Sequence, residues 1–239
     1  MKTILITGGA GFIGSHLCDF LIQKGCRVIC VDNLFTGSKK NIEHLLGNKN
    51  FRFIEHDIIN PLFIENEKID QIYNLACPAA PVHYQRDPIY TIKTNVLGVL
   101  NMLGLAKKHG ARILQASTSE VYGDPQVHPQ DEEYLGHVHP HGPRACYDEG
   151  KRLGETLCFD YHRKHKLDIR VARIFNTYGP RQSARAIIPT VITQIASGSR
   201  KIKLGSLHPT RDFNYVKDTV NGFIAAAESD HVIGKVINI

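Results

Sequence analysis

The sequence lacks several features that would place it in a specialised class of protein. Its six cysteines, at positions 18, 26, 30, 77, 146 and 158, include no C-x-x-C pair, so their spacing predicts neither a zinc nor an iron–sulfur site. No apolar run approaches the ~20 residues of a membrane span. No Lys/Arg-dense stripe with interleaved aromatic residues is present, which argues against a nucleic-acid partner. No repeat or low-complexity tract occurs.

The first residues, MKTILITGG, enter an apolar run directly, with no charged leader or cleavage site. Cysteines in a chain without such a signal are expected to be reduced thiols. A cytoplasmic location is therefore the expectation.

The composition is that of a globular protein with one large core. The chain has 239 residues, 42% of them hydrophobic, and a formal net charge of +6. This length suits one α/β domain or one domain with a small appendage. The positive charge favours an anionic partner, here a phosphate-bearing small molecule such as a nucleotide.

Short apolar runs alternate with helical segments along the chain. We expect strands at 2–7, 26–31, 51–56, 71–76, 111–116 and 168–175, and helices near 12–24, 88–109, 147–165 and 185–198. Strands separated by helices predict an α/β fold, a Rossmann-like doubly wound parallel sheet with its ligand site at the carboxyl ends of the strands. The expected division is a dinucleotide-binding domain at 1–176 and a mixed segment at 177–239. That segment would supply substrate-binding elements and the last strands, and its end at KVINI (235–239) resembles a strand cut off at its end.

A glycine-rich loop, TGGAGFIG (7–14), follows the first predicted strand at once. Gly9, Gly11 and Gly14 fit the G-x-G-x-x-G dinucleotide fingerprint. Gly8, Gly11 and Gly14 also fit the tighter G-x-x-G-x-x-G form. Glycine lets the backbone turn sharply and approach a pyrophosphate, which then lies on the N-terminus of the next helix. Asp32 ends the second predicted strand, 18 residues after Gly14. A carboxylate there hydrogen-bonds a ribose diol and repels a 2′-phosphate, so NAD is predicted rather than NADP.

Tyr147 and Lys151 are one helical turn apart in ACYDEGKRLGE (145–155). Residues at i and i+4 share a helix face, so such a pair taken alone is usually a cation–π contact or plain solvated surface. On a dinucleotide-binding domain it has a chemical role. A tyrosine is a base at neutral pH only if its pKa of ~10 falls, and an ammonium and a cationic nicotinamide ring both favour the phenolate. Thr118, at the end of the fifth predicted strand, would complete a hydroxyl–tyrosine–lysine relay.

Together these stretches resemble the extended short-chain dehydrogenase/reductase family. The resemblance is carried by TGGAGFIG, DNLFTG (32–37), STSEVYGDP (117–125), YDEGK (147–151) and RIFNTYGPR (173–181). Within that family, CPAAPVHYQ (77–85), the 91–113 segment and GPRACYDEGKR (142–152) are similar to the UDP-glucuronate decarboxylases. The resemblance covers residues 1–181 almost without a gap.

The resemblance implies an NAD-dependent decarboxylation of UDP-glucuronate to UDP-xylose through a 4-keto intermediate, with no net redox change. Tyr147, assisted by Lys151 and Thr118, would take the proton of the sugar 4-hydroxyl, and Glu120 would position the ring or handle a proton at C5. For Glu120 the alternative is a solvent-exposed carboxylate at a strand end. The family also implies a homodimer, built from the 88–109 and 147–165 helices as a four-helix bundle.

Cofactor and substrate positions follow from the same resemblance. The NAD contacts it implies are Gly8, Gly11, Phe12, Ile13, Gly14, Asp32, Asn33, Phe35, Thr36, Gly37, Asp57, Ile58, Leu75, Cys77, Thr94, Ala116, Tyr147, Lys151 and Thr177. The UDP-sugar contacts it implies are Lys93, Asn176, Arg185 and Arg211. Lys93 and Arg185 could equally be solvated surface charges.

Two departures keep other activities open. Residues 182–223 are more like nucleotide-sugar 4,6-dehydratases and epimerases, which leaves a 4,6-dehydratase or 4-epimerase as the alternative enzyme. A 4,6-dehydratase of this family carries an acidic residue after the active-site threonine, whereas this chain has Ser119, which disfavours dehydration. The family also continues beyond KVINI, so a truncated NAD-binding module without turnover is the non-enzymatic alternative.

Overall fold

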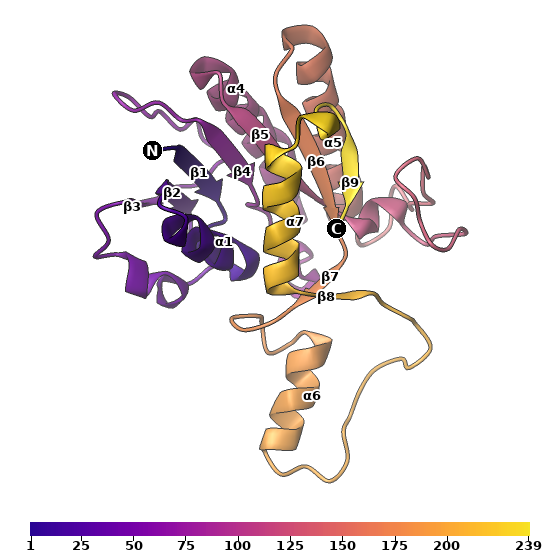
Figure 1. Ribbon diagram of the computed structural model, residues 1–239. Helices are drawn as coiled ribbons and strands as arrows, with labels where there is room; N and C mark the ends of the chain where they lie inside the picture. Colours follow the sequence, from indigo (N-terminus) through magenta and orange to yellow (C-terminus); the bar gives the residue numbers. More distant parts are fainter.

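The computed structural model describes residues 1–239 and contains one sheet of seven parallel strands (Figure 1). The strands are β1 (Thr3–Thr7), β2 (Arg27–Asp32), β3 (Phe51–Glu55), β4 (Gln71–Asn74), β5 (Arg112–Thr118), β6 (Ile169–Ile174) and β9 (Val236–Asn238). Their order in space is β3-β2-β1-β4-β5-β6-β9. The predicted doubly wound parallel fold is confirmed.

Helices cover both faces of the sheet. One face carries α1 (Phe12–Gln23) and α7 (Val216–Glu228), and the other carries α4 (Val99–His109) and α5 (Ala145–His165). Successive residues of β1 point to opposite faces. Ile6 packs into the cluster that contains Phe223 of α7, whereas Leu5 packs into the cluster that contains Met102 of α4. This two-sided burial explains why the strands are continuous apolar runs rather than alternating ones.

The expected 88–109 helix is one continuous helical rod with an irregular turn inside it. It comprises α3 (Pro88–Lys93), a π-helical stretch η3 (Thr94–Gly98) and α4. By length and composition alone this 22-residue rod could cross a membrane, contrary to our reading of the sequence. Half of its most apolar window is buried inside the fold, as expected of a core helix packed on a sheet.

The switch in strand order lies between β1 and β4. The chain leaves β1 for β2 on one side and enters β4 on the other side, so the crevice at the carboxyl ends of these strands is open to a ligand. Four short 3₁₀ turns lie in the connections: η1 (Lys39–Asn41), η2 (Glu43–Leu45), η4 (Ser119–Tyr122) and η5 (Asp230–Val232).

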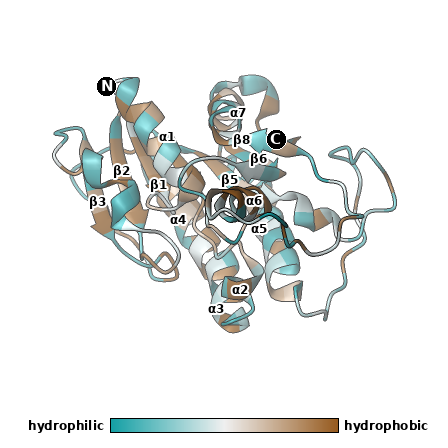
Figure 2. Cartoon of the chain, turned by 90° about the horizontal axis from the view of Figure 1, so that it is seen from below, coloured by the Kyte–Doolittle hydropathy of each residue, from teal (hydrophilic) through white to brown (hydrophobic).

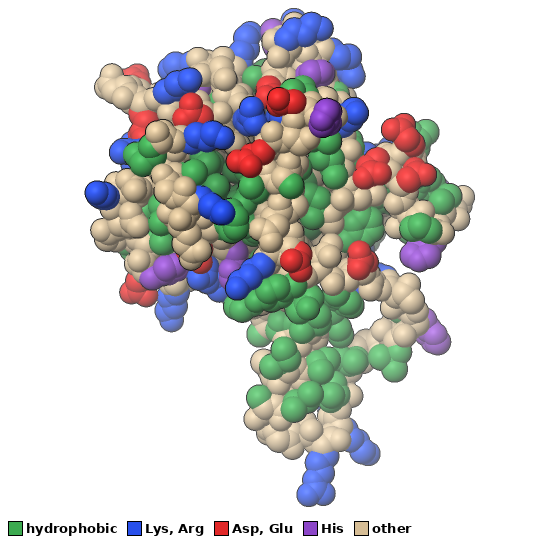
Figure 3. Space-filling model, viewed as in Figure 1, with side chains coloured by type: hydrophobic (Ala, Val, Ile, Leu, Met, Phe, Trp, Pro, Cys, Tyr) green, Lys and Arg blue, Asp and Glu red, His purple; other side chains and the backbone are tan.

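Beyond β6 the chain leaves the sheet and later returns to it. β7 (Asn176–Tyr178) and β8 (Phe213–Tyr215) form a separate parallel pair, and α6 (Ile187–Ala196) lies between them in sequence. Figure 1 shows α6 and the following loop projecting beyond the carboxyl ends of the strands. No residue of α6 is buried, and apolar side chains of this helix are exposed on the projecting lobe (Figures 2 and 3). The sequence did not predict α7, β7, β8 or the short α2 (Pro81–Tyr84).

Candidate active site

The glycine loop between β1 and α1 is shaped for close approach by a ligand. Gly8 has a positive φ of 67°, and a Cβ on Gly14 would lie 2.2 Å from the carbonyl oxygen of Gly8. Gly11 is the N-cap of α1, and no side chain caps the helix. The N-terminal N–H groups of α1 are therefore free of side-chain competitors. The loop fits the pyrophosphate of a dinucleotide.

Asp32 is held rigidly at the end of β2. One carboxylate oxygen accepts a hydrogen bond from the Ala10 N–H (3.0 Å), and the other accepts one from the Leu34 N–H (2.8 Å). Burial raises the pKa of Asp32, and these two N–H groups counteract the rise. A Cβ on Gly37 would lie 2.8 Å from the carboxylate. Asp32 thus borders the glycine loop, as a ribose ligand should.

The residues expected at the adenosine end come together beyond β2 and β3. The Asn33 side-chain amide donates to the Asp57 carboxylate (2.9 Å), while Phe35 and Thr36 lie exposed at the rim. Ile58 differs from the others because its side chain is 3% exposed and packs against Gly98 in the core.

The residues expected near the nicotinamide surround the loops after β4 and β5. The backbone of Leu75 and Ala76 lies against the turn at Gly8, and Cys77 packs against the cluster that contains Tyr147. Thr94 is buried in η3 and donates its hydroxyl hydrogen bond to the carbonyl of Tyr90 (2.9 Å). Thr177 of β7 points instead toward α7, where its hydroxyl lies 3.0 Å from that of Thr219.

Tyr147 and Lys151 are buried side by side in the first two turns of α5. Their side chains are 6% and 5% exposed, and the Lys151 ammonium lies 5.9 Å from the centre of the Tyr147 ring. The ammonium donates a hydrogen bond to the Ala116 carbonyl of β5 (2.9 Å), two residues before Thr118. The solvated-surface interpretation of the pair is therefore wrong.

The expected lowering of the tyrosine pKa is not seen in the protein alone. Burial raises the pKa of Tyr147, and the Cys77 thiol and nearby carboxylates raise it further, while the Thr118 hydroxyl counteracts the rise. A phenolate loses its hydration when buried, which is the larger effect here. Positive charge from a bound cofactor would favour the phenolate and so act against this rise.

The Glu120 carboxylate is paired, although its side chain is 37% exposed. It lies in η4 directly after β5, and its carboxylate accepts a hydrogen bond from the guanidinium of Arg144, the N-cap of α5. Arg144 also lies 3.7 Å from the carboxylate of Asp148, one turn further along α5. Burial raises the pKa of Asp148 to about 6. One guanidinium is thus shared by two carboxylates beside Tyr147.

Sequence reasoning missed three side chains around Tyr147 and one near Asp57. Tyr84 of α2 stacks on Tyr147 with ring centres 4.9 Å apart and planes 7° from parallel. Arg144 and Asp148 flank Tyr147 in sequence, and Tyr90 meets Asp57. Arg144 and Asp148 belong to the GPRACYDEGKR stretch, so their place next to Tyr147 and Lys151 was the available signal. Tyr84 belongs to the CPAAPVHYQ stretch, which was its available signal, whereas nothing in the sequence pattern marks Tyr90.

A buried ion pair supports the strand that carries Thr118. Arg173 of β6 donates to both carboxylate oxygens of Glu155 on α5 (3.0 and 2.7 Å). Glu155 also accepts the hydroxyl hydrogen bond of Ser117 on β5 (2.5 Å). These contacts fix α5, β5 and β6 relative to one another beneath the site.

The expected sugar contacts are not gathered at this cluster. Lys93 is exposed on α3, and Asn176 begins β7, where it is half-buried. Arg185 and Arg211 are exposed at the two ends of the projecting lobe, and neither forms an ion pair. Arg211 donates only to the carbonyl of Thr210 (2.7 Å).

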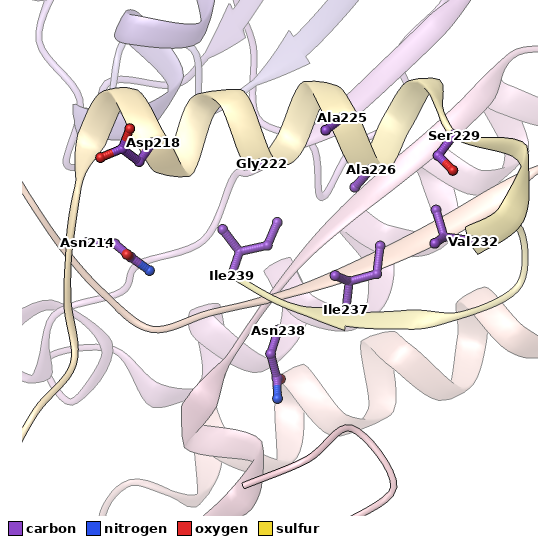
Figure 4. A pocket seen from close by; sticks show the side chains of 10 residues that line it. All are labelled: Asn214, Asp218, Gly222, Ala225, Ala226, Ser229, Val232, Ile237, Asn238 and Ile239. Atoms are coloured by element: carbon purple, nitrogen blue, oxygen red, sulfur yellow. The ribbon is translucent and has the colours of Figure 1, made fainter. Parts of the chain in front are cut away.

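A cavity of about 420 Å³ lies elsewhere, between α7 and β9. Figure 4 shows Ile237 of β9 and the adjoining Ile239 directed toward α7, where Gly222 and Ala226 face them. None of its lining residues belongs to the glycine loop or to the Tyr147 cluster. It is therefore separate from the candidate site.

Comparison with known proteins shows which family has this site. The family model for GDP-mannose 4,6 dehydratase matches residues 5–239. UDP-glucuronic acid decarboxylase 1 of Xenopus tropicalis is 56% identical over 231 residues, which are 96% of this chain and 54% of that protein. UDP-glucuronic acid decarboxylase 5 of Arabidopsis thaliana is 55% identical over 95% of this chain and 67% of its own length. The chain spans about half to two-thirds of the length of such relatives.

Solved structures of the same architecture include proteins with bound nucleotides. UDP-glucose 4-epimerase of Thermotoga maritima, determined with UDP-glucose, has a TM-score of 0.86 at 30% identity and covers 100% of this chain and 76% of its own. dTDP-glucose 4,6-dehydratase of Bacillus anthracis, determined with NAD, has a TM-score of 0.86 at 28% identity, with 100% and 75% coverage. With its glycine loop, Asp32 and the Tyr147–Lys151 pair, the chain belongs to the GDP-mannose 4,6-dehydratase family of extended short-chain dehydrogenases/reductases, and UDP-glucuronic acid decarboxylases are among its relatives.

Proposed function

We propose that the protein binds NAD and decarboxylates UDP-glucuronate to UDP-xylose. The observation that carries this proposal is the arrangement of Glu120 and Tyr147 at the carboxyl edge of the sheet, in a chain 52–56% identical to curated UDP-glucuronic acid decarboxylases. NAD, when bound, accepts the hydride of the sugar C4 and later returns it. The glycine loop and Asp32 would hold its pyrophosphate and adenosine ribose.

The chain's own residues handle the protons. Tyr147 takes the proton of the 4-hydroxyl, assisted by Thr118 and by the positive charge of Lys151. The resulting 4-ketone makes the C6 carboxylate a β-keto acid, whose C5–C6 bond breaks to release CO₂ while its electrons enter the carbonyl. Glu120, whose charge acts on Tyr147, would position the sugar ring or deliver the proton that C5 takes up. Tyr147 finally returns its proton to the 4-oxygen, so one proton is consumed per CO₂ released.

Ser119 supports decarboxylation over dehydration. Loss of a 6-hydroxyl requires a general acid at the leaving group, and a serine hydroxyl is not acidic enough at neutral pH. Ser119 is half-buried directly before Glu120 at the start of η4. A 4-epimerase requires neither acid, and the structural relationship to UDP-glucose 4-epimerase makes it the second candidate.

Product identification tests the proposal. The purified chain is incubated with NAD⁺ and UDP-glucuronate, and in parallel with UDP-glucose, and the nucleotide sugars are identified by mass spectrometry. UDP-xylose from UDP-glucuronate supports the proposal. A 4-epimer supports the second candidate. Unchanged substrates in the presence of bound NAD would contradict turnover by this chain and favour a binding module.

We propose that the protein assembles as a homodimer through α3, α4 and α5. Apolar side chains are exposed along these neighbouring helices, among them Ile92 of α3 (41%), Leu97 of the η3 stretch that joins α3 to α4 (44%) and Leu153 of α5 (44%). Two copies pairing these faces would form a four-helix bundle and bury the apolar surface. Leu97→Glu combined with Leu153→Glu should give a monomer by analytical ultracentrifugation. A dimer in that double variant would contradict the proposed interface.

We also propose that the protein functions in the cytoplasm. All six cysteines are free thiols, as is usual in a reducing compartment. Fractionation of cells that express the protein at its natural level tests this, and recovery with membranes would contradict it.

A further inference from the structure

Tyr90 connects two residues that the family resemblance assigns to the adenosine end of NAD. Its hydroxyl donates a hydrogen bond to the Asp57 carboxylate (2.6 Å) and accepts one from the Asn33 side-chain amide (2.5 Å). The same amide donates to Asp57 (2.9 Å), which closes a triangle of hydrogen bonds. The three residues come from separate connections, after β2, after β3 and after β4.

The ring of Tyr90 extends the cluster to the rim of the crevice. Phe35, 41% exposed, packs against Tyr90 with ring centres 5.2 Å apart. On its other side Phe35 lies near His83, with ring centres 6.5 Å apart. An aromatic group at the rim offers a flat apolar surface to a nucleobase, and the Asp57 carboxylate beside it accepts hydrogen bonds.

The backbone holds Tyr90 in place. Asp87 caps α3 by accepting a hydrogen bond from the Tyr90 N–H (2.8 Å), and Pro88 begins the helix. The Thr94 hydroxyl donates to the Tyr90 carbonyl one turn later (2.9 Å). The side chain is therefore presented from a capped helix rather than from a loose loop, as positioning of a ligand group requires.

We propose that Tyr90 is a positioning residue for the cofactor, which fixes Asn33 and Asp57 and closes the adenosine pocket together with Phe35. The proposal rests on NAD binding within the proposed function. A redox-neutral cycle requires the cofactor to stay bound between the two hydride transfers. An adenosine pocket closed by Tyr90 and Phe35 serves this retention because it is remote from the reacting carbon and slows release without altering the chemistry.

Titration with fragments of the cofactor tests the assignment without turnover. ADP-ribose and NAD⁺ are titrated calorimetrically into wild type and Tyr90→Phe, which keeps the ring and removes the hydroxyl. We expect about 5- to 10-fold weaker binding of both ligands, the effect of losing about one ordinary hydrogen bond. The thermal midpoint should fall by only about 2–4 °C, so the fold is retained. Tyr161→Phe, on α5, is the matched control.

A second variant keeps the proposal testable if Tyr90→Phe fails to fold. Phe35→Leu alters an exposed side chain, so the fold is retained, and it should also weaken ADP-ribose binding. Wild-type affinity for ADP-ribose in both variants would overturn the proposal. Failure of wild type to bind ADP-ribose would overturn it too. The outcome can also separate the two proposals. If wild type does not decarboxylate UDP-glucuronate but binds ADP-ribose, and Tyr90→Phe binds ADP-ribose weakly, the proposed reaction is refuted and the role of Tyr90 is supported.

Discussion

Lys151 donates its ammonium hydrogen bond to the carbonyl oxygen of Ala116, 2.9 Å away, and so ties α5 to β5 at the candidate active site. Both partners are buried. The contact sets the height of Tyr147 on α5 relative to Thr118, two residues beyond Ala116 on β5. The relay is thus built from a helix and a strand, which position side chains more firmly than loops do.

Tyr147→Phe should abolish turnover and leave cofactor binding intact. The variant keeps the ring that stacks on Tyr84 but removes the hydroxyl that is proposed to take the 4-hydroxyl proton. We expect at least a ~10²-fold loss of kcat, the usual contribution of a positioned acid–base group. Product formation is measured by chromatography and NAD⁺ affinity by calorimetry. Wild-type kcat in this variant would refute the role of Tyr147.

Gly14→Ala should prevent NAD binding. The added Cβ would lie 2.2 Å from the Gly8 carbonyl oxygen, so the loop must open where the pyrophosphate is expected. Gly47→Ala is the control, because no atom lies within 4 Å of a Cβ there. Calorimetric titration with NAD⁺ should show no binding to Gly14→Ala and normal binding to Gly47→Ala. Equal affinities would place the cofactor elsewhere.

Glu155→Gln should destabilise the fold by about 3 kcal/mol. The substitution leaves the Arg173 guanidinium buried without its countercharge, which is the costly way to break a buried ion pair. Arg163→Gln breaks an exposed pair with Asp160 on the same helix and should cost at most ~0.5 kcal/mol. Urea unfolding compares the two variants. Similar free energies of unfolding would show that the buried pair is dispensable.

Asp148 should make stability fall as the pH rises through its native pKa. Burial raises that pKa to about 6, whereas an unfolded aspartate has a pKa of ~3.9. The native state therefore holds a proton between these values that the unfolded chain has released, and stability declines across this window by up to ~3 kcal/mol. Asp148→Asn removes the ionisation, so it should stabilise the protein at pH 7.5 but not at pH 4.

Thermal unfolding at the two pH values measures this effect. The difference in melting temperature between Asp148→Asn and wild type should be positive at pH 7.5 and close to zero at pH 4. The same difference at both values would show that the ionisation of Asp148 is not coupled to folding.

The sheet could be predicted from sequence because buried parallel strands leave continuous apolar runs. The expected strand at 26–31 appears as Arg27–Asp32, and the expected helix at 147–165 appears as Ala145–His165. The strands β7 and β8 escaped detection because each has three residues, too few to show a period. Helix α7 was missed because the alternation of apolar runs and helical segments weakens after about residue 176.

The site could be predicted only where its residues lie close together in sequence and form a recognisable motif. The glycine loop and the Tyr147–Lys151 pair are local patterns, and the structure places each as expected. Tyr84 and Tyr90 act on residues 63 and 33 positions away, and the fold alone brings them together. The rise that burial causes in the pKa of Tyr147 could not be predicted, because one sequence does not reveal how deeply a side chain is buried.

The central claim is that one hydride leaves the sugar C4 and returns to it while C6 departs as CO₂. The most direct measurement uses UDP-glucuronate carrying deuterium at C4, with products analysed by mass spectrometry and NMR. The account predicts UDP-xylose that retains the deuterium at C4, even with unlabelled NADH in the solution. UDP-xylose that has lost the deuterium, or no release of CO₂, would contradict it.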